Sequence, residues 1–528
     1  MNSIFVFFIK EKKLKSDSYK ISTALISVSD KTGIVEFARQ LNELGIEIYS
    51  TGGTAKALKD EKIPVKSITE LTEFPEILDG RVKTLHPSIH AGLLAKLDNG
   101  EHIAQLSKHD IKSIDLLVVN LYPFEETLAK GANHEDLIEN IDIGGPAMLR
   151  AAAKNYKWTA PVVNPLRYNE IINILLDKDR RLPESYRAEL AQEVFEFTSY
   201  YDSLIAIYLR DFNKKELPDK LSLPMITSQK LRYGENPHQS GRLYGHYSKI
   251  FTQLHGKELS YNNIIDIDAA SKLILEFETP ALAIIKHTNP CGVGSGKNLA
   301  EAYKKAFATD TVSPFGGIIV MNRALDLETA EAIHSLFTEV IIAPEFNNDA
   351  LDLLKKKKDR RLITTDFDLM KTSIKYELKS VTGGYLIQTA DLKLFDESQL
   401  RVVTKRQPTK EEYDAMMFGW KVAKHVKSNA IVYSLSDRTL GIGAGQMSRV
   451  DSSRIAVEKA KMMNLNLKGS AIASDAFFPF PDGVLEAAKA GATAVIQPGG
   501  SVRDEEVIKA ADENNMTMIF TGMRHFKH

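Results

Sequence analysis

Residues Thr23–Tyr49 read TALISVSDKTGIVEFARQLNELGIEIY, and this stretch predicts a strand, a helix and a second strand in succession. Thr23–Val28 is a short apolar run of strand type. Apolar side chains then recur at helical spacing from Ile34 to Leu44, and Gly45 predicts the end of that helix. Ile46–Tyr49 resumes a strand. Strands that alternate with helices in this way indicate a parallel sheet covered on both faces.

The same alternation extends outward along the chain of 528 residues. Ile114–Leu121 (IDLLVVNL) is typical of a fully buried strand, and one long amphipathic helix is predicted from Leu190 to Phe212. Residues 213–228 (NKKELPDKLSLPMITS) are polar, carry two prolines and predict a linker. Strand patterns return at Ala281–Ile285 and Thr493–Gln497. The sequence therefore predicts two α/β units, over 21–212 and 229–528.

The charge balance and the cysteine count bear on which partners the chain binds and which metal or disulfide sites it can form. Lys and Arg number 68 against 69 Asp and Glu, so no general excess of positive charge favours nucleic-acid binding. A small charged ligand fits this balance better. The single cysteine, Cys291, excludes an internal disulfide and a multi-cysteine zinc site. We expect a cytoplasmic protein.

The first twenty residues stand apart from this pattern. Residues 4–9 (IFVFFI) form an apolar run that is too short for a membrane span or a typical signal core. A charged stretch follows it. We therefore expect residues 1–20 to be an N-terminal extension and expect no association with a membrane.

Two loops of the first unit have the composition of a phosphate site. Ser27–Gly33 (SVSDKTG) and Ser50–Thr54 (STGGT) each follow a predicted strand and precede a helix. Hydroxyls, an ammonium group and glycines at helix N-termini suit an anion. Ser, Thr and Asp are also ordinary helix caps, so either loop alone leaves both interpretations open.

Two further segments add charged groups. Gly80–Pro87 (GRVKTLHP) contains three potential cations, and Asp142 precedes a helix that carries Arg150 and Lys154. Taken singly, Asp142 can be a helix cap and Lys154 a solvated side chain. Two cofactor motifs fail: residues 292–298 (GVGSGKN) lack the first glycine and the hydroxyl residue of a Walker loop. Residues 441–446 (GIGAGQ) lack the third glycine of a dinucleotide fingerprint.

In the second unit, Lys286 and His287 follow directly on an apolar strand and are the candidate acid and base. A solvated Lys and a backbone-bonded His remain the alternative. Further polar clusters lie at residues 231–238, 428–429, 445–449 and 475–482. A zinc deaminase would require H-x-E with P-C-x-x-C, which one cysteine cannot supply.

SVSDKTG, STGGT, GRVKTLHP, NLYPF and IDIGG, in this order, resemble the inosine monophosphate (IMP) cyclohydrolase domain of the bifunctional purine biosynthesis family. The resemblance implies a parallel-sheet domain like methylglyoxal synthase. It also implies that the nucleotide phosphate and neighbouring groups are bound by Ser27, Ser29, Lys31, Ser50, Gly52, Gly53, Arg81 and Thr84. The implied catalytic set is Lys83, Tyr122, Asp142 and Lys154. We expect Asp142 to act as base and Lys83 to stabilise the oxyanion, supported by the other two.

LRYGENPHQ, KHTNPCG, DTVSPFGG, SNAIVY, GIGAGQMSRVD, SDAFFPFPDG and RHFKH resemble the family's transformylase domain, which formylates aminoimidazole carboxamide ribonucleotide (AICAR). The resemblance implies two cytidine-deaminase-like α/β subdomains without zinc. It implies catalysis by Lys286, His287 and Asn429, and a nucleotide site with Arg232, Tyr233, Phe315, Gly316, Phe477, Arg524 and His528. Near the folate it implies Arg449, Val450, Pro479, Phe480 and Asp482. Pro481, which precedes Asp482, and the acidic Glu339 depart from the expected pattern.

These resemblances imply one enzyme with two activities. It would take 10-formyltetrahydrofolate as co-substrate, require no metal, and act as a homodimer with transformylase sites at the interface. His287 is suited to accept the amine proton near neutral pH, and we prefer Lys286 as the acid. A nucleotide sensor with non-catalytic cradles is the alternative. Lys83, Asp142, Lys286 and His287 argue against it, because a sensor need not retain them.

Overall fold

The computed structural model describes residues 19–78 and 80–528, which form two compact units divided between Met225 and Ile226. Of the N-terminal extension expected over residues 1–20, residues 1–18 lie outside the described residues. Across the described ranges, no helix combines the length and apolar character needed to cross a bilayer.

The first unit is built on a five-stranded sheet whose described strands are all parallel. Its order is β3-β2-β1-β4-β5. The strands are β1 Thr23–Ser27, β2 Glu47–Ser50, β3 Lys66–Ser67, β4 Leu116–Val119 and β5 Ala160–Val162. The parallel α/β sheet predicted from Thr23–Tyr49 is thereby confirmed.

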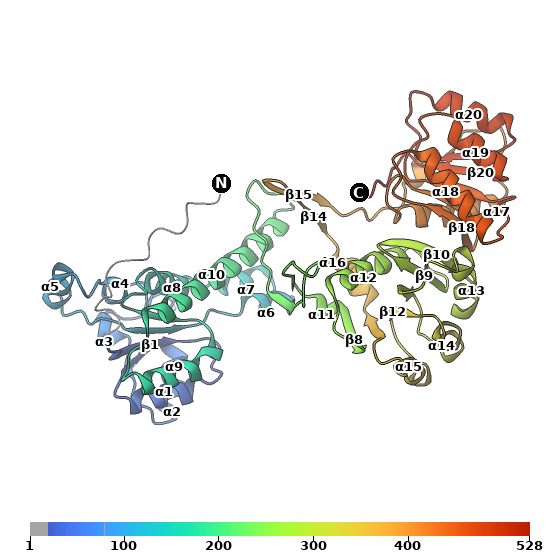
Figure 1. The fold of residues 1–528 in the computed structure, drawn as a ribbon. Helices are drawn as coiled ribbons and strands as arrows, with labels where there is room; N and C mark the ends of the chain where they lie inside the picture. The colour runs from blue at the N-terminus through green and yellow to red at the C-terminus, as the bar shows by residue number, and fades with distance from the viewer. Residues whose placement is uncertain (1–18, 79) are drawn as a thin grey trace. The chain divides into compact units, whose positions relative to one another are not determined.

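Helices cover both faces of this sheet (Figure 1). Alternate strand residues feed two cores: Ala24 and Ile26 pack with α1 and α9, while Leu25 packs with α4, α8 and α10. This alternation follows from the two-residue period of a strand. The helices of the unit are α1 Ile34–Glu43, α2 Gly52–Asp60, α3 Thr69–Thr72, α4 Pro87–Leu94, α5 Gly100–Lys108, α6 Phe124–Ala129, α7 His134–Glu139, α8 Gly144–Lys154, η2 Pro165–Arg167, α9 Tyr168–Asp177 and α10 Glu184–Phe212.

The second unit contains a twelve-stranded mixed sheet of order β16-β21-β20-β19-β17-β18-β10-β9-β11-β12-β13-β8. Its first half comprises β8 Phe251–His255, α12 Tyr261–Ile274, β9 Ala281–Lys286, β10 Asn289–Ser295, α13 Leu299–Thr309, β11 Gly317–Met321, α14 Leu327–His334, β12 Thr338–Ala343, α15 Asn348–Lys355 and β13 Arg361–Thr365. Its second half comprises β16 Arg401–Val402, α17 Lys410–Ala423, β17 Ile431–Leu435, β18 Arg438–Gly443, α18 Arg449–Met462, β19 Ala471–Ser474, α19 Asp482–Ala490, β20 Ala494–Gln497, α20 Asp504–Glu513 and β21 Thr517–Phe520.

The two halves repeat one order of elements. Each runs strand, helix, antiparallel hairpin, helix, strand, helix, strand, helix, strand, and the halves meet where β10 pairs antiparallel with β18. The α/β character predicted for this half of the chain is confirmed. The remaining elements are β6 Thr227–Lys230, β7 Arg242–Tyr244, α11 Tyr247–Ile250, α16 Phe367–Ser373, β14 Tyr376–Val381, β15 Gly384–Thr389 and η3 Glu397–Gln399.

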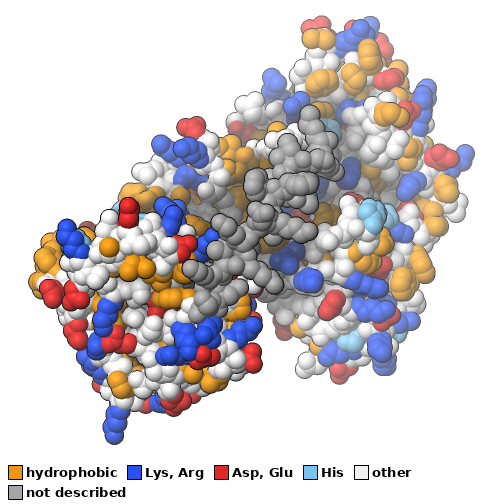
Figure 2. All heavy atoms as spheres, turned by 60° about the vertical axis from the view of Figure 1, so that its left-hand side comes forward, with side chains coloured by type: hydrophobic (Ala, Val, Ile, Leu, Met, Phe, Trp, Pro, Cys, Tyr) orange, Lys and Arg blue, Asp and Glu red, His pale blue; other side chains and the backbone are white. Residues whose placement is uncertain are grey.

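Charged side chains of both signs are interspersed over the face of the molecule seen in Figure 2. This distribution agrees with the nearly equal numbers of basic and acidic residues.

Candidate functional site

A cavity of about 720 Å³ opens at the carboxyl ends of β1, β2 and β4 in the first unit. The carboxyl ends of parallel strands share one edge of a sheet, and ligands of open α/β sheets bind at that edge. Nine of the residues predicted from the sequence line the cavity: Ser27, Ser29, Lys31, Gly53, Arg81, Lys83, Thr84, Tyr122 and Asp142.

The floor of the cavity is held by hydrogen bonds between neighbouring strand ends. The hydroxyls of Ser27 and Thr51 lie 2.7 Å apart, and Thr54 Oγ1 bonds both the amide and the carbonyl of Val28 at 3.1 and 2.9 Å. Asn120 Oδ1 accepts the Ser29 amide at 2.6 Å. These bonds fix the loops after β1 and β2 before any ligand binds.

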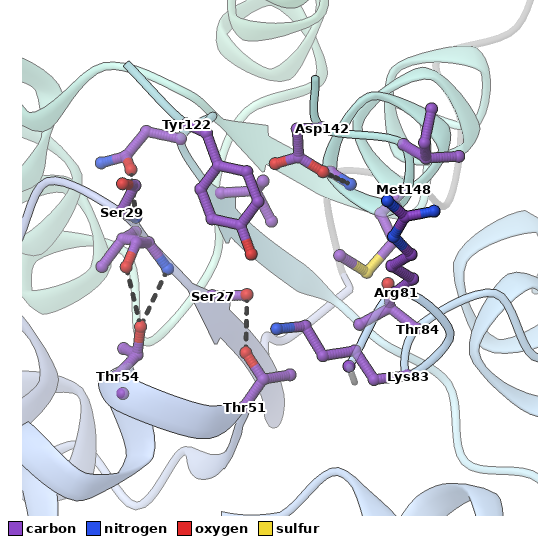
Figure 3. Close-up of a pocket in the computed structure, with 18 of the residues that line it drawn as sticks. Ser27, Ser29, Thr51, Thr54, Arg81, Lys83, Thr84, Tyr122, Asp142 and Met148 are labelled. Carbon is purple, nitrogen blue, oxygen red and sulfur yellow. Dashed lines mark hydrogen bonds between the residues drawn. The ribbon is translucent and has the colours of Figure 1, made fainter. Parts of the chain in front are cut away.

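The cavity has the chemistry of an anion site. Helix α2 begins at Gly52 beside it, so unpaired backbone N–H groups are available at its rim. Lys31, Arg81 and Lys83 supply positive charge, although Arg81 also pairs with Glu139. In Figure 3 the side chains of Ser27, Lys83 and Tyr122 point into the same space, with Asp142 at its border.

Asp142 is held in a defined position just before α8. Its Oδ1 accepts the Gly145 amide at 2.8 Å, and its own amide donates to the Tyr201 hydroxyl at 2.9 Å. Burial raises the pKa of Asp142 above its ordinary value, while the Gly145 bond and the charge of Lys83 act to lower it. A Cβ at Gly145 would lie 2.6 Å from Asp142 Oδ2, so this close approach requires glycine. Asp142 therefore both caps the helix and faces the cavity.

Three predicted residues do not line this cavity. Ser50 is 1% exposed and donates its hydroxyl to the Ile26 carbonyl at 2.7 Å, and Gly52 lies beside the lining residue Gly53. Lys154 lies at the far end of α8 and lines a separate groove with Arg150 and Phe195. Helix α8 has eleven residues, a length of about 16 Å, between the loop of Asp142 and Lys154, which explains why one cavity does not hold both.

The lining residues that the sequence did not predict include two polar residues at strand ends, Thr51 and Asn120. Asn120 directly follows the buried strand β4, at the sheet edge where ligands bind. A polar residue in that place was a usable signal. Thr51 was not distinguishable from its neighbour Ser50 by sequence, because the turn after β2 decides which hydroxyl faces the cavity.

Strand directions bring the predicted transformylase residues of the second unit to one edge of its sheet. Following the pairings from β9, the carboxyl ends of β9, β18, β19, β20 and β21 share an edge with the amino ends of β10, β11 and β17. At this edge lie Lys286 at the end of β9 and His287 after it, Phe315 and Gly316 before β11, Asn429 before β17, Arg449 after β18, Phe477 after β19, and Arg524 after β21. We refer to it as the transformylase edge.

His287 occupies a strained turn at this edge. Lys286 pairs with Asn289, so His287 and Thr288 form a two-residue hairpin loop, with φ of 51° and 63°. Each non-glycine residue in this left-handed region costs about 1–3 kcal/mol and is common at functional sites. His287 is therefore exposed at this edge, and its backbone adopts a conformation that is unfavourable for a residue other than glycine.

Lys286 and the loop before β11 are joined directly. Lys286 Nζ donates to the Phe315 carbonyl at 2.8 Å. The Gly316 amide donates to the Phe337 carbonyl at 2.8 Å, and the exposed rings of Phe315 and Phe337 lie 4.9 Å apart. An ammonium group beside two exposed aromatic rings suits a flat, polar ligand.

Asn429 is tied into a buried network. Its Oδ1 accepts Arg449 Nη1 at 3.0 Å, and Arg449 also donates to Ser474 Oγ at 2.7 Å and to Asp475 Oδ1 at 2.8 Å. The Lys427 amide donates to Asn289 Oδ1 at 2.9 Å, which links this segment to the His287 hairpin. Arg449, predicted near the folate, thus has its Nε and both of its terminal nitrogens engaged within the protein.

The other predicted residues of this unit lie on its surface segments. Val450 is the second residue of α18, and Pro479, Phe480 and Asp482 lie at the start of α19. The Arg232 guanidinium lies 5.8 Å above the Tyr233 ring, in the segment between β6 and β7. His528 lies 5.5 Å from the ring of Phe526. Glu339 accepts Asn263 Nδ2 at 2.8 Å.

Comparison with known proteins gives extensive matches. A family model described as "AICARFT/IMPCHase bienzyme" matches residues 152–459, and one described as "MGS-like domain" matches residues 33–147. The bifunctional purine biosynthesis protein PurH of Chlorobium luteolum is 54% identical over 521 residues, which cover 96% of this chain and 99% of that protein. PurH of Bacillus subtilis is 52% identical over 516 residues, covering 96% and 100%. A solved structure described as "Crystal structure of ForH" is 32% identical over 35% of this chain and 97% of its own, with a TM-score of 0.32.

Proposed function

The chain belongs to the AICARFT/IMPCHase bienzyme family, and from this premise we propose that each of its two units carries one of the two activities. The protein is a bifunctional enzyme of IMP biosynthesis, with AICAR formyltransferase and IMP cyclohydrolase activities. Its family uses a formylated folate as co-substrate. Ring closure is assigned to the cavity of the first unit, and formyl transfer to the transformylase edge of the second.

The cavity suits ring closure because it combines an anion cradle with one partly buried carboxylate. The nucleotide phosphate is assigned to the N-terminus of α2 and to Lys31. Asp142, Lys83 and Tyr122 are assigned to the heterocyclic part of the nucleotide, where the ring closes. As the carboxamide nitrogen attacks the formyl carbon, Asp142 accepts the proton that this nitrogen loses. Lys83 and Tyr122 stabilise the negative charge on the formyl oxygen. This oxygen then takes up the proton held by Asp142 and the proton of the formamido nitrogen, its bond to the formyl carbon breaks, and it leaves as water. Both reacting groups belong to one molecule, so binding only has to orient them.

The transformylase edge suits transfer of a formyl group between two bound molecules. The amine of AICAR attacks the formyl carbon of 10-formyltetrahydrofolate, and His287 accepts the amine proton. Lys286 donates a proton to the departing folate nitrogen. Asn429 bridges the formyl oxygen and the amine, and its bond to Arg449 supports a role for Arg449 in orienting Asn429.

The single observation that carries the first assignment is the position of Asp142 in a cavity it shares with Lys83. Burial raises the pKa of Asp142, and the charge of Lys83 acts against this rise. Replacing Lys83 with methionine removes this effect, so the pKa of Asp142 rises. A general base works only when ionised, and the acid limb of the cyclisation rate therefore moves to higher pH. The pH profile of IMP formation from the formylated nucleotide measures this shift.

Lys31→Met is the matched control, because Lys31 is a second lysine that lines the cavity, whereas Lys83 is the lysine whose charge acts to lower the pKa of Asp142. Its acid limb is expected to stay in the wild-type position even if affinity falls. An unchanged acid limb in Lys83→Met, with activity still measurable, would exclude Asp142 as a base coupled to Lys83.

The protein is further assigned as a homodimer in which a second copy covers the transformylase edge. Support comes from the aromatic side chains left uncovered there: Phe315 is 64% exposed and Phe337 is 51% exposed. Exposed aromatic clusters of this kind are typical of protein interfaces. Sedimentation velocity of the wild-type protein is expected to give twice the mass of one chain. For the double variant Phe315→Asp/Phe337→Asp, the measured mass is expected to move toward that of a single chain. A wild-type monomer that is fully active would contradict the assignment.

A further inference from the structure

We propose that Asp266 is a positioning residue that holds the turn carrying His287, so that the imidazole is presented at the transformylase edge. The inference rests on the proposed role of His287 as the base in formyl transfer. It adds a residue on a different element, α12, which lies outside the sequence motifs that point to this site.

The turn requires support from outside itself. His287 and Thr288 both have positive φ, and two-residue hairpin loops of this kind favour Asn-Gly. Thr288 is the more difficult case, because a β-branched side chain at positive φ is a steric outlier. Strained residues of this kind persist only when the surrounding structure over-determines them. The local sequence His-Thr therefore does not explain the observed backbone.

Asp266 supplies the missing support. The Thr288 amide donates to Asp266 Oδ1 at 2.7 Å. On the other side of the loop, Thr288 Oγ1 and Asn289 Nδ2 donate to the His287 carbonyl at 2.7 and 3.1 Å. The carboxylate thus holds the Thr288 amide, while the side chains of Thr288 and Asn289 hold the His287 carbonyl.

The element that carries Asp266 is itself well fixed. Helix α12 begins with a reciprocal cap between Ser260 and Asn263, and its residues Ile267 and Ala270 are fully buried in the core beneath β9. A side chain on this helix is therefore a rigid reference point for the hairpin. Hydrogen bonds to a carboxylate are stronger than those to a neutral acceptor, which suits a turn under strain.

The charge of Asp266 serves the same purpose. Burial raises the pKa of Asp266, and the bond from Thr288 and the charge of His287 lower it. The hydrogen bond from Thr288 favours the ionised carboxylate, which is the form that accepts this amide most strongly. Asp266 does not touch the reacting atoms in this arrangement, and it acts through His287.

The test compares formyl-transfer kinetics of Asp266→Ala, Asp266→Asn and the double variant Asp266→Ala/Thr288→Gly. Asp266→Ala is expected to lower kcat by about tenfold or more, with a smaller change in KM, because misplacing one catalytic group has effects of this size. Asp266→Asn is expected to lose less, since its amide oxygen still accepts the Thr288 amide. Thr288→Gly is expected to restore part of the lost kcat, because glycine adopts the turn without support.

Asp268→Ala is the matched control, because Asp268 lies on the same helix and pairs with Lys272 instead. Thermal unfolding of each variant shows whether it is folded, and if Asp266→Ala is not, the same comparison is made with Asp266→Asn and Asp266→Asn/Thr288→Gly. Unchanged kcat in Asp266→Ala, or no recovery on adding Thr288→Gly in a folded protein, would overturn the inference. If His287→Ala itself retains formyl transfer, the proposed function fails instead, whatever the Asp266 variants show.

Discussion

Replacing His287 with alanine is expected to abolish formyl transfer and to leave ring closure at the wild-type rate. The amine of AICAR is a poor nucleophile and has to lose a proton as it attacks, so loss of the base removes about 10²–10⁴-fold in rate. Ring closure is assigned to the other unit of the chain, which contains none of the transformylase edge. Tetrahydrofolate release measures the first activity, and IMP formation from added formylated nucleotide measures the second.

His246→Ala provides the control for this substitution, because His246 is exposed and belongs to the same unit but not to the transformylase edge. Both activities are expected to survive it. If His287→Ala retains formyl transfer within a fewfold of wild type, His287 is not the base. If His287→Ala also loses ring closure while it remains folded, the assignment of one activity to each unit is wrong.

Asp142→Asn is expected to have the opposite effect, abolishing ring closure while formyl transfer continues and the formylated nucleotide accumulates. Asparagine keeps the size of the side chain and an oxygen that can accept the Gly145 amide, so the change isolates the loss of charge. Removal of a general base predicts a loss of about 10²–10⁴-fold. Consumption of added formylated nucleotide is the direct measurement.

Asp98→Asn is the matched control, since Asp98 is an exposed carboxylate of the same unit that does not line the cavity. Its cyclisation rate is expected to be unchanged. If ring closure survives in Asp142→Asn, Asp142 is not the general base. Its role is then structural, through its bond to the Gly145 amide before α8.

Much of the fold could be predicted from hydrophobic periodicity. The strand expected at Thr23–Val28 is β1 at Thr23–Ser27, and the long helix expected from Leu190 is α10, which begins earlier, at Glu184. The strand expected at Ala281–Ile285 is β9. Buried strands and amphipathic helices leave a strong local signal, because their period is set by the backbone itself.

The arrangement of the site was predictable only where strand order made it so. Polar residues after β1, β2 and β4 converge because parallel strands end at one edge, and most of the predicted cavity residues do lie there. Lys154 does not, because a helix of eleven residues carries it away from Asp142. Asp266 could not be found from the sequence, since only the packing of α12 beside the hairpin brings it to Thr288.

Mixing the two inactive variants tests most directly the claim that the chain holds two separate active sites. His287→Ala and Asp142→Asn are each supplied alone, and then together, with AICAR and 10-formyltetrahydrofolate, and IMP is measured. The account predicts almost no IMP from either variant alone, and IMP formation by the mixture as the formylated nucleotide made by Asp142→Asn reaches the intact cavity of His287→Ala. A mixture that forms no more IMP than the two variants apart, although Asp142→Asn releases the formylated nucleotide, would contradict it.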